Sequence, residues 1–325
     1  MKTLNTVIAV AMITFGVSPA PIMAQAPAYP TKPIRVVVPF GPGSAPDILA
    51  RMVAQDLSDS IGPAVVENRP SSSGVIGVDY VAKSAADGYT LLLGMTSTQT
   101  ITPALYANIS YNPLRDFTPV AMLAYAPFVL VVANDVPAKS LPELIAYAKT
   151  IPGKLTFATA GPGSMNDICV ELIKGKAGID LVQVPYKGIA LGVPDVISGR
   201  VSMMCNSAAA LLPQIKSGRM RAIVTADVKR SAVLPDLPTL AEAGLAGSEV
   251  ASWYAVYGPA GLPASVTQKL NAQIGKMLAS ANARKRFSEL GLDSSPTTPE
   301  ELGEITRRDL QKWTKVIRDN NIKAE

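Results

Sequence analysis

Two short segments of the same type carry the residues best suited to hold a ligand. They read Gly41-Pro42-Gly43-Ser44-Ala45-Pro46-Asp47 and Gly161-Pro162-Gly163-Ser164-Met165-Asn166-Asp167, 120 residues apart. Each follows an apolar, strand-like run and opens a helix-like one. Gly and Pro favour a tight turn, Ser suits the N-cap, and Asp three residues later would complete a capping box. Such a junction leaves backbone N–H groups at the positive end of a helix dipole, which predicts an anion site in each segment.

The chain contains no histidine. This excludes a Ser-His-Asp triad, a histidine general base and nearly all catalytic zinc sites. We find no pair of carboxylates and no Ser/Lys arrangement in a convincing motif context. The sequence therefore favours a binding protein with no catalytic residue, metal or cofactor. A secreted enzyme that uses carboxylate or serine chemistry is the weaker alternative.

The N-terminus has the pattern of a secretory signal peptide. Lys2 precedes an apolar stretch from Val7 to Val17, which is too short to span a bilayer, and small residues follow. We predict a signal peptide of residues 1–24 with cleavage after Ala24, because cleavage after Ala26 would leave proline at the new N-terminus. No later apolar run approaches about 20 residues, so we expect a soluble mature protein.

The net charge of +5 is spread along the chain. Its densest cluster, Arg284-Lys285-Arg286, lies in a helical stretch with Phe287 and Leu290, which indicates a solvated helix face rather than a nucleic-acid site. A weak positive field still favours anionic ligands.

Cys169 and Cys205 are the only cysteines in the sequence. They could pair in an oxidising compartment, but we favour two buried thiols.

From Lys32 onward the chain alternates strand and helix signals, which predicts an α/β fold. The expected strands are 34–40, 64–67, 90–94, 155–159, 180–184, 201–205, 221–225 and 250–257, with one or two more in 120–132. The expected helices are 48–57, 75–83, 142–149, 165–174, 193–198, 211–216, 265–278, 282–290 and 299–320, with a short one in 235–247.

This order predicts two lobes with a cleft between them. Lobe 1 is expected to comprise 27–126 plus 250–325, and lobe 2 to comprise 127–249. The chain would cross between them near 125–129 and 248–253, and these crossings would act as a hinge. Hinge bending can close such a cleft around a ligand and bring both helix N-termini onto it.

Five short motifs in order resemble the Bug family of extracytoplasmic solute receptors, from Tyr29 to near the C-terminus. They are Tyr29-Pro30-x-Lys32-Pro33-Ile34-Arg35, Val38-Pro39-Phe40-x-Pro42-Gly43, Glu67-Asn68-Arg69-Pro70, Asp87-Gly88-Tyr89-Thr90 and Val184-Pro185-Tyr186-Lys187-Gly188. Members of this family are the substrate-binding components associated with tripartite tricarboxylate transporters.

The resemblance implies a type II, or Venus-flytrap, periplasmic binding protein with two lobes, a central cleft and a hinge. Its expected role is to bind a small organic carboxylate or dicarboxylate in the periplasm and deliver it to integral-membrane transporter subunits. We expect a monomer that binds no nucleic acid and needs no cofactor. A sensory receptor that presents its ligand to a membrane signalling protein is the alternative within the same scaffold.

The resemblance also assigns site residues, lobe by lobe. In lobe 1 they are Phe40, Gly41, Pro42, Gly43, Ser44, Thr96, Ser97 and Thr98. In lobe 2 they are Gly163, Ser164, Asn166, Asp167, Lys187, Gly188, Cys205 and Asn206. Ser44, Asp167 and Asn206 stand where glycine, histidine and aspartate are common, so ligand identity transfers least well.

Each assignment has a structural alternative. Ser44 and Ser164 could cap helices without contacting a ligand, and Lys187 could be a surface lysine. Asp167 could partner a cationic or hydroxyl group of the ligand or simply cap its helix. Asn206 could donate to a carboxylate where aspartate could only accept. The backbone turns are the strongest prediction.

Overall fold

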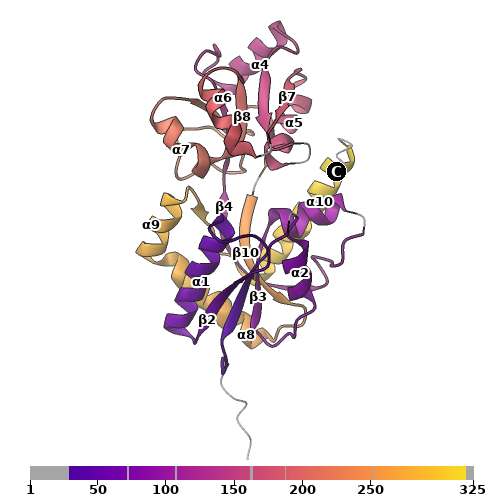
Figure 1. Ribbon diagram of the computed structural model, residues 1–325, viewed down its shortest axis with the longest axis vertical. Coiled ribbons are helices and arrows are strands. Elements are labelled where there is room, and N and C mark those ends of the chain that lie inside the picture. Colours follow the sequence, from indigo (N-terminus) through magenta and orange to yellow (C-terminus); the bar gives the residue numbers. More distant parts are fainter. Residues whose placement is uncertain are drawn as a thin grey trace, which may run out of the picture.

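The computed structural model describes residues 29–71, 73–106, 108–161, 164–186, 188–250 and 252–319. The predicted signal peptide lies outside these ranges. Two α/β lobes are stacked along the long axis of the molecule (Figure 1). The lower lobe carries both the N-terminal indigo segments and the C-terminal orange and yellow ones. The upper lobe carries the intermediate magenta and salmon segments.

The sheet of lobe 1 has six strands in the order β11-β4-β10-β3-β1-β2. Their bounds are β1 (Ile34–Val38), β2 (Ala64–Asn68), β3 (Thr90–Met95), β4 (Phe117–Ala126), β10 (Ser252–Pro259) and β11 (Asp293–Ser294). β1 runs parallel to β2 and β3, whereas β10 is antiparallel to β3 and β4. The carboxyl ends of β1 and β3 therefore meet at one end of the sheet, where α/β proteins bind ligands.

Helices cover both faces of this sheet. They are α1 (Ala45–Ser60), α2 (Val75–Ala82), α3 (Thr102–Leu105), α8 (Ala264–Ala279), α9 (Ala281–Glu289) and α10 (Pro299–Asp319). In β1, Val36 and Val38 pack with Leu49 of α1, while Val37 packs on the opposite face with Val78 of α2. Successive strand residues point to opposite faces, so a run of valines suits a strand buried on both sides.

The sheet of lobe 2 has five strands in the order β7-β6-β8-β5-β9. Their bounds are β5 (Phe128–Val132), β6 (Thr156–Thr159), β7 (Val182–Pro185), β8 (Met203–Ser207) and β9 (Arg221–Thr225). The helices are α4 (Leu141–Thr150), α5 (Met165–Ala177), α6 (Val193–Ile197) and α7 (Ala208–Lys216), with a 3₁₀ turn η2 (Ile189–Gly192) before α6.

The chain passes between the sheets at two places. β4 ends at Ala126 and β5 begins at Phe128, so only Pro127 separates strands of different sheets. Proline has no N–H to donate, which suits a point where strand pairing must stop. The predicted strand region 120–132 therefore contains two strands. On the return, the Val250 N–H donates to the Ala226 carbonyl just after β9, and Ser252 begins β10 of the other sheet.

The last helix braces these passages. Trp253 Nε1 donates to Asp309 of α10 at 2.9 Å, and Lys312 Nζ donates to the carbonyl of Glu249. Trp313 and Ile317 of α10 belong to the same buried cluster as the core of lobe 2. The side chain of Trp253 is fully buried at this passage.

One expectation for the elements is wrong. Residues 235–247 form turns without the expected helix, because Gly244 and Gly247 adopt φ of +91° and +90°, outside the helical region. The polar segment after β3 is a π-helical turn, η1 (Ser97–Ile101). No helix in the described ranges combines the length and apolar character that crossing a membrane requires.

Candidate ligand-binding site

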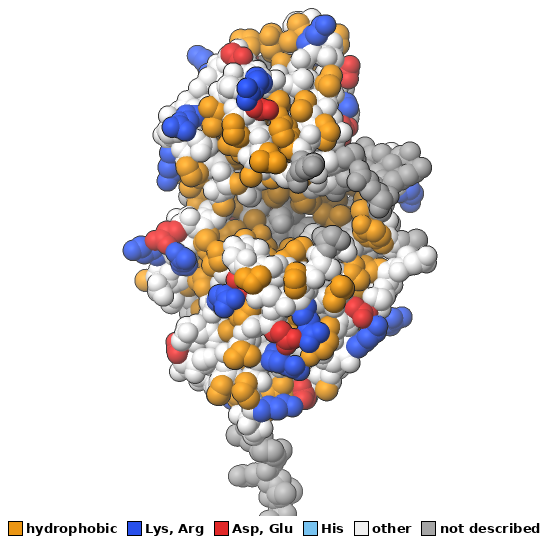
Figure 2. All heavy atoms as spheres, in the orientation of Figure 1, with side chains coloured by type: hydrophobic (Ala, Val, Ile, Leu, Met, Phe, Trp, Pro, Cys, Tyr) orange, Lys and Arg blue, Asp and Glu red, His pale blue; other side chains and the backbone are white. Residues whose placement is uncertain are grey.

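The predicted site residues gather at the sheet ends next to the two interlobe passages. In lobe 1, Thr96 follows β3, whose last residue Met95 pairs with Tyr254 near the start of β10. In lobe 2, Asn206 pairs with Val129 near the start of β5. Each cluster thus lies on the edge of its lobe nearest the other lobe. The space-filling view has a hollow between the lobes at this level (Figure 2).

The lobe 1 turn opens α1, but its capping differs from the prediction. Ser44 occupies the N-cap position, yet its side chain accepts no bond from the helix; Oγ instead donates to the Gly41 carbonyl at 2.7 Å. The Asp47 carboxylate accepts from the Gly43 N–H at 2.9 Å. The predicted Ser44–Asp47 capping box is therefore wrong. The Asp47 carboxylate accepts from the Gly43 N–H, and the Ser44 hydroxyl donates to the Gly41 carbonyl, so neither side chain caps the helix as a capping box requires.

Asp47 is buried and stays charged. Burial alone would raise its pKa, but hydrogen bonds from Arg51, from the Gly43 N–H and from Asn68 outweigh burial and lower the pKa below the usual value. The carboxylate thus uses the Gly43 amide. Within the described part of the chain, the N–H groups of Ser44 and Ala45 donate no hydrogen bond. These two amides remain at the positive end of α1, available to an anion.

Gly74 brings a second helix start to the same place, which the sequence analysis did not single out. It is the N-cap of α2 at φ +75°. A Cβ there would lie 2.9 Å from Cγ2 of Thr98 and 3.2 Å from the ring of Phe40. Only glycine allows this approach, so the α2 N-terminus lies against two predicted site residues. The local sequence of three serines followed by Gly74 does not indicate this contact with Phe40 and Thr98.

The three hydroxyl residues after β3 have different roles. Thr96 Oγ1 accepts from the Trp253 N–H at 2.8 Å, and Thr98 Oγ1 accepts from the Met95 N–H at 3.2 Å. Both threonines are buried, whereas Ser97 is partly exposed. Thr96 therefore fixes the end of β3 against β10, Thr98 holds the turn that follows β3, and Ser97 is the one of the three that solvent reaches.

The lobe 2 turn caps its helix as predicted. Ser164 is the N-cap of α5, and its Oγ accepts from the Asp167 N–H at 3.3 Å. Thr159 Oγ1 lies 3.1 Å from Ser164 Oγ and accepts from the Gly161 N–H at 3.1 Å. The hydroxyl of β6 thus holds the turn to the sheet. Gly163, a predicted ligand residue, lies outside the described residues.

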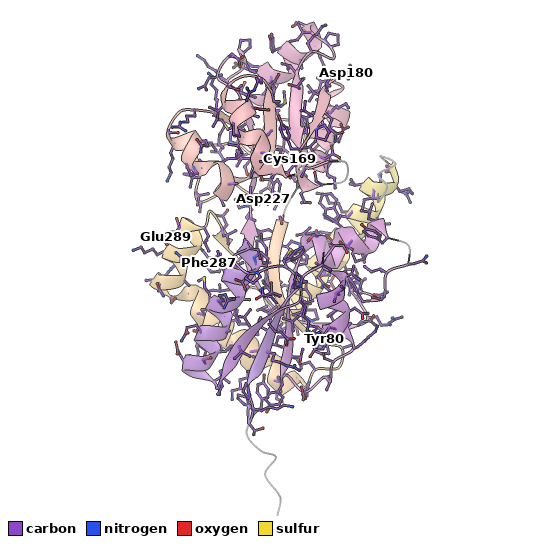
Figure 3. All side chains as sticks on the ribbon, viewed as in Figure 1. Tyr80, Cys169, Asp180, Asp227, Phe287 and Glu289 are labelled. Carbon is purple, nitrogen blue, oxygen red and sulfur yellow. A yellow bond between two sulfur atoms is a disulfide. The ribbon has the colours of Figure 1, made fainter. Side chains whose placement is uncertain are left out.

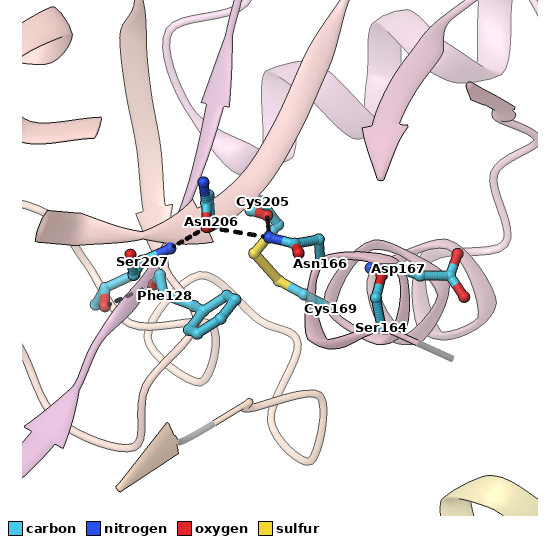
Figure 4. The surroundings of a disulfide bond; sticks show 9 residues. Phe128, Ser164, Asn166, Asp167, Cys169, Cys205, Asn206 and Ser207 are labelled. Carbon is cyan, nitrogen blue, oxygen red and sulfur yellow. Dashed lines mark hydrogen bonds between the residues drawn. A yellow bond between two sulfur atoms is a disulfide. The ribbon is translucent and has the colours of Figure 1, made fainter. Parts of the chain in front are cut away.

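Two asparagines join α5 to the end of β8 (Figure 4). Asn166 Nδ2 donates to the Cys205 carbonyl at 2.8 Å and to Asn206 Oδ1 at 3.1 Å. The Ser207 N–H donates to the same Oδ1 at 2.8 Å. These bonds use both lone pairs of Oδ1 and orient the carboxamide. Within the described residues, Asn206 Nδ2 donates no bond, so it offers N–H donors.

Cys169 and Cys205 form a disulfide, which corrects the expectation of two thiols. Both residues are fully buried, with Cα atoms 6.2 Å apart. The bond connects the second turn of α5 to the end of β8, one residue before Asn206. The sequence could not reveal this pairing. The helix α5 follows β6, and it comes close to β8 only because β6 and β8 are neighbours in the sheet.

Asp167 serves the scaffold. Its Oδ1 accepts from Gln183 Nε2 at 2.5 Å, so the carboxylate ties the start of α5 to β7. Gly188 is partly buried before η2, while Lys187 lies outside the described residues. The described site residues include neither lysine nor arginine, so amides, hydroxyls and a carboxamide are their donors. No group of three or more metal-binding side chains occurs in the described ranges.

Comparisons with known proteins agree with this architecture. The family model described as "Tripartite tricarboxylate transporter family receptor" matches residues 49–322. The chain is 36% identical to Protein BugT of Bordetella pertussis over 100% of this chain and 99% of that protein.

Two solved structures are similar over most of the chain. The structure "R. palustris Rpa4515 with adipate" has a TM-score of 0.75 at 34% identity, over 91% of this chain and 99% of that one. MatC of Rhodopseudomonas palustris with bound malate has a TM-score of 0.71 at 31% identity, over 89% of this chain and 100% of that one. With the family model, these matches lead to one conclusion: the chain belongs to the Bug, or TctC, family of periplasmic solute receptors of tripartite tricarboxylate transporters.

Proposed function

We propose that this protein binds a small organic dicarboxylate between its lobes and delivers it to a membrane transporter of the tripartite tricarboxylate type. The observation that carries the proposal is the pair of helix starts, α1 and α5, at facing sheet ends without a basic side chain among the described site residues. Relatives with adipate and with malate support a ligand that has two carboxylates.

The proposed binding divides the ligand between the lobes. One carboxylate accepts from the Ser44 and Ala45 amides of α1, with the α2 start beside it. The other accepts from Asn206 Nδ2 and from the turn before α5. Closure removes water from both groups, which strengthens each charge–dipole interaction. Because the two ends are held by different lobes, a dicarboxylate favours the closed form more than a monocarboxylate does.

The test is isothermal titration of the purified mature protein with adipate, malate, succinate, citrate and benzoate, with glucose as a non-acid probe. We expect at least one dicarboxylate to bind with a Kd at or below the micromolar range and to raise the melting temperature as its concentration increases. Saturable binding of glucose, with none by any acid, would refute the proposal.

The proposal includes the route to the periplasm and the assembly state. Family members are periplasmic receptors. For this chain we propose export by residues 1–24, with cleavage after Ala24, and function as a monomer. We also propose that 27–126 plus 250–325 move as one body and 127–249 as the other.

A further inference from the structure

A second cavity lies on the opposite flank of the interlobe passages. Its volume is ≈ 400 Å³. Lobe 1 contributes Tyr125 at the end of β4, Phe287 of α9 and Asp293 of β11, while lobe 2 contributes Asp227 and Lys229 after β9. β11 and β4 form the edge of the lobe 1 sheet opposite to β1 and β2. The cavity is therefore separate from the candidate site.

Asp227 is the unusual group in this cavity. It is only 3% exposed. Its one hydrogen bond within the described residues comes from the Val228 N–H at 2.6 Å, and no described lysine or arginine lies within 4.0 Å of its carboxylate. Burial, with a smaller contribution from Asp293, raises its pKa to about 6. Figure 3 has Asp227 at the lower edge of lobe 2 and Phe287 on α9 below it.

Asp293 faces the same space from lobe 1. Its Oδ1 accepts from the Ala232 N–H of lobe 2 at 3.1 Å, which makes it part of the interlobe contact. Burial raises the pKa of this carboxylate as well, against smaller opposing contributions from the Ala232 N–H, the Ser231 hydroxyl and Lys229. Two carboxylates on different lobes thus share a partly closed cavity. Buried carboxylates are costly unless a cation or several donors satisfy them.

Lys229 acts electrostatically on both carboxylates and Lys312 on Asp227, but within the described residues no lysine or arginine nitrogen lies within 4.0 Å of either carboxylate. Lys229 Nζ lies 5.8 Å from the centre of the Tyr125 ring, and Lys312 Nζ donates to the Glu249 carbonyl. Arg230 is paired with Glu242 at 3.0 Å. Arg230 and Arg284 also line the cavity, and Arg284 is exposed on α9. In the described part of the chain, neither Asp227 nor Asp293 takes part in an ion pair.

We propose that this cavity binds a small molecule with a primary ammonium group, held between Asp227 and Asp293, with its apolar part against Tyr125 and Phe287. An ammonium has three donors and one positive charge, which matches two carboxylates that lack an ion-pair partner. The aromatic rings suit a short hydrocarbon chain and favour a nearby cation. The cavity volume of ≈ 400 Å³ is large enough for a small primary amine with a short hydrocarbon chain.

A ligand in this cavity contacts both lobes. Its binding is therefore linked to the angle between them, and so to binding in the cleft between α1 and α5. Linkage requires that the ammonium compound and the cleft ligand change each other's affinity by the same factor. The cavity is in this sense an effector site for the receptor.

The test is isothermal titration of the full mature protein with n-propylammonium chloride at pH 7.5, with propionate as the probe of opposite charge. We expect saturable binding of propylammonium and none of propionate at this cavity. Asp227→Asn keeps the acceptor for the Val228 N–H and removes the charge, so it should weaken propylammonium binding at least about ten-fold. The matched control is Asp236→Asn, an exposed carboxylate of the same lobe.

Several outcomes overturn the inference. Absence of saturable propylammonium binding to the wild-type protein does so directly. Equal binding by the Asp227→Asn and wild-type proteins does so too, as does equal weakening by Asp236→Asn. Circular dichroism and the melting temperature of each variant verify folding, and Asp293→Asn is the second variant if Asp227→Asn fails to fold. The readout does not depend on dicarboxylate binding, so failure here leaves the proposed function intact.

Discussion

At the scale of single residues, the proposed site presents oriented polar groups, with no lysine or arginine among its described residues. Asn206 illustrates this. Its Oδ1 accepts from Asn166 and from the Ser207 N–H, so Nδ2 remains as the donor. An ionised aspartate at this position could only accept. The asparagine therefore makes this part of lobe 2 a donor.

We predict that Asn206→Asp weakens dicarboxylate binding by about 10- to 100-fold. Aspartate keeps the bonds from Asn166 and Ser207 but places a negative charge where a donor stood, so the ligand carboxylate loses a bond and meets repulsion. Isothermal titration at pH 7.5 measures the change. Asn282→Asp, an exposed site on α9, is the control. Unchanged affinity in the Asn206 variant would remove this residue from the proposed site.

Residue-level prediction from sequence succeeded where the interaction is local. Ser164 caps α5 as expected because its partner, Asp167 N–H, is three residues away. Ser44 does not cap α1, since Asp47 is drawn toward Gly43, Arg51 and the distant Asn68. The same motif thus gives two hydrogen-bond patterns. The difference depends on a strand neighbour that the local sequence does not reveal.

At the scale of elements, the strands and most helices follow from apolar periodicity. Valine-rich β1 and amphipathic α8 are predictable because burial fixes their patterns. β11 has two residues and leaves no pattern. The contact of α2 with Phe40 and Thr98, and the meeting of α5 with β8, depend on tertiary packing. The sequence therefore predicted the two turns of the site. It did not predict the packing of Gly74 against the lobe 1 turn or the disulfide that connects α5 to β8.

We predict that the double variant Cys169→Ala, Cys205→Ala is destabilised by about 3 kcal/mol, because the disulfide closes a loop of 36 residues in the unfolded chain. Urea unfolding of the variant and of the wild-type protein measures the difference. Dicarboxylate affinity should also fall, since the Cys205 carbonyl anchors Asn166. Wild-type stability in the double variant would show that the disulfide is absent or has no stabilising effect.

At the scale of the whole molecule, Asp227 makes stability depend on pH. Its raised pKa, about 6 in the folded protein, means that the folded state binds this proton more tightly than the unfolded state does. The carboxylate therefore destabilises the fold above about pH 6, and this cost disappears as the pH falls toward the ordinary pKa of aspartate, about 4.

We predict that Asp227→Asn raises the free energy of unfolding by up to about 3 kcal/mol at pH 7.5 and by only about 1 kcal/mol at pH 4.5. Asn retains the Val228 bond and removes only the buried charge. Thermal unfolding of both proteins at the two pH values measures the difference. Asp236→Asn should leave both values unchanged. Equal stabilisation at the two pH values would mean that the charge of Asp227 is not responsible.

The placement of α10 limits how the receptor can move. This helix starts on the outer side of lobe 1, and its final turns share a buried cluster with the core of lobe 2. Trp313 and Ile317 would lose that cover if the lobes separated along the α10 side. We therefore expect the lobes to open by rotating about an axis that runs along α10 and the two passages. In that motion a ligand enters on the side of the cleft away from α10, and a partner bound to α10 would limit the opening.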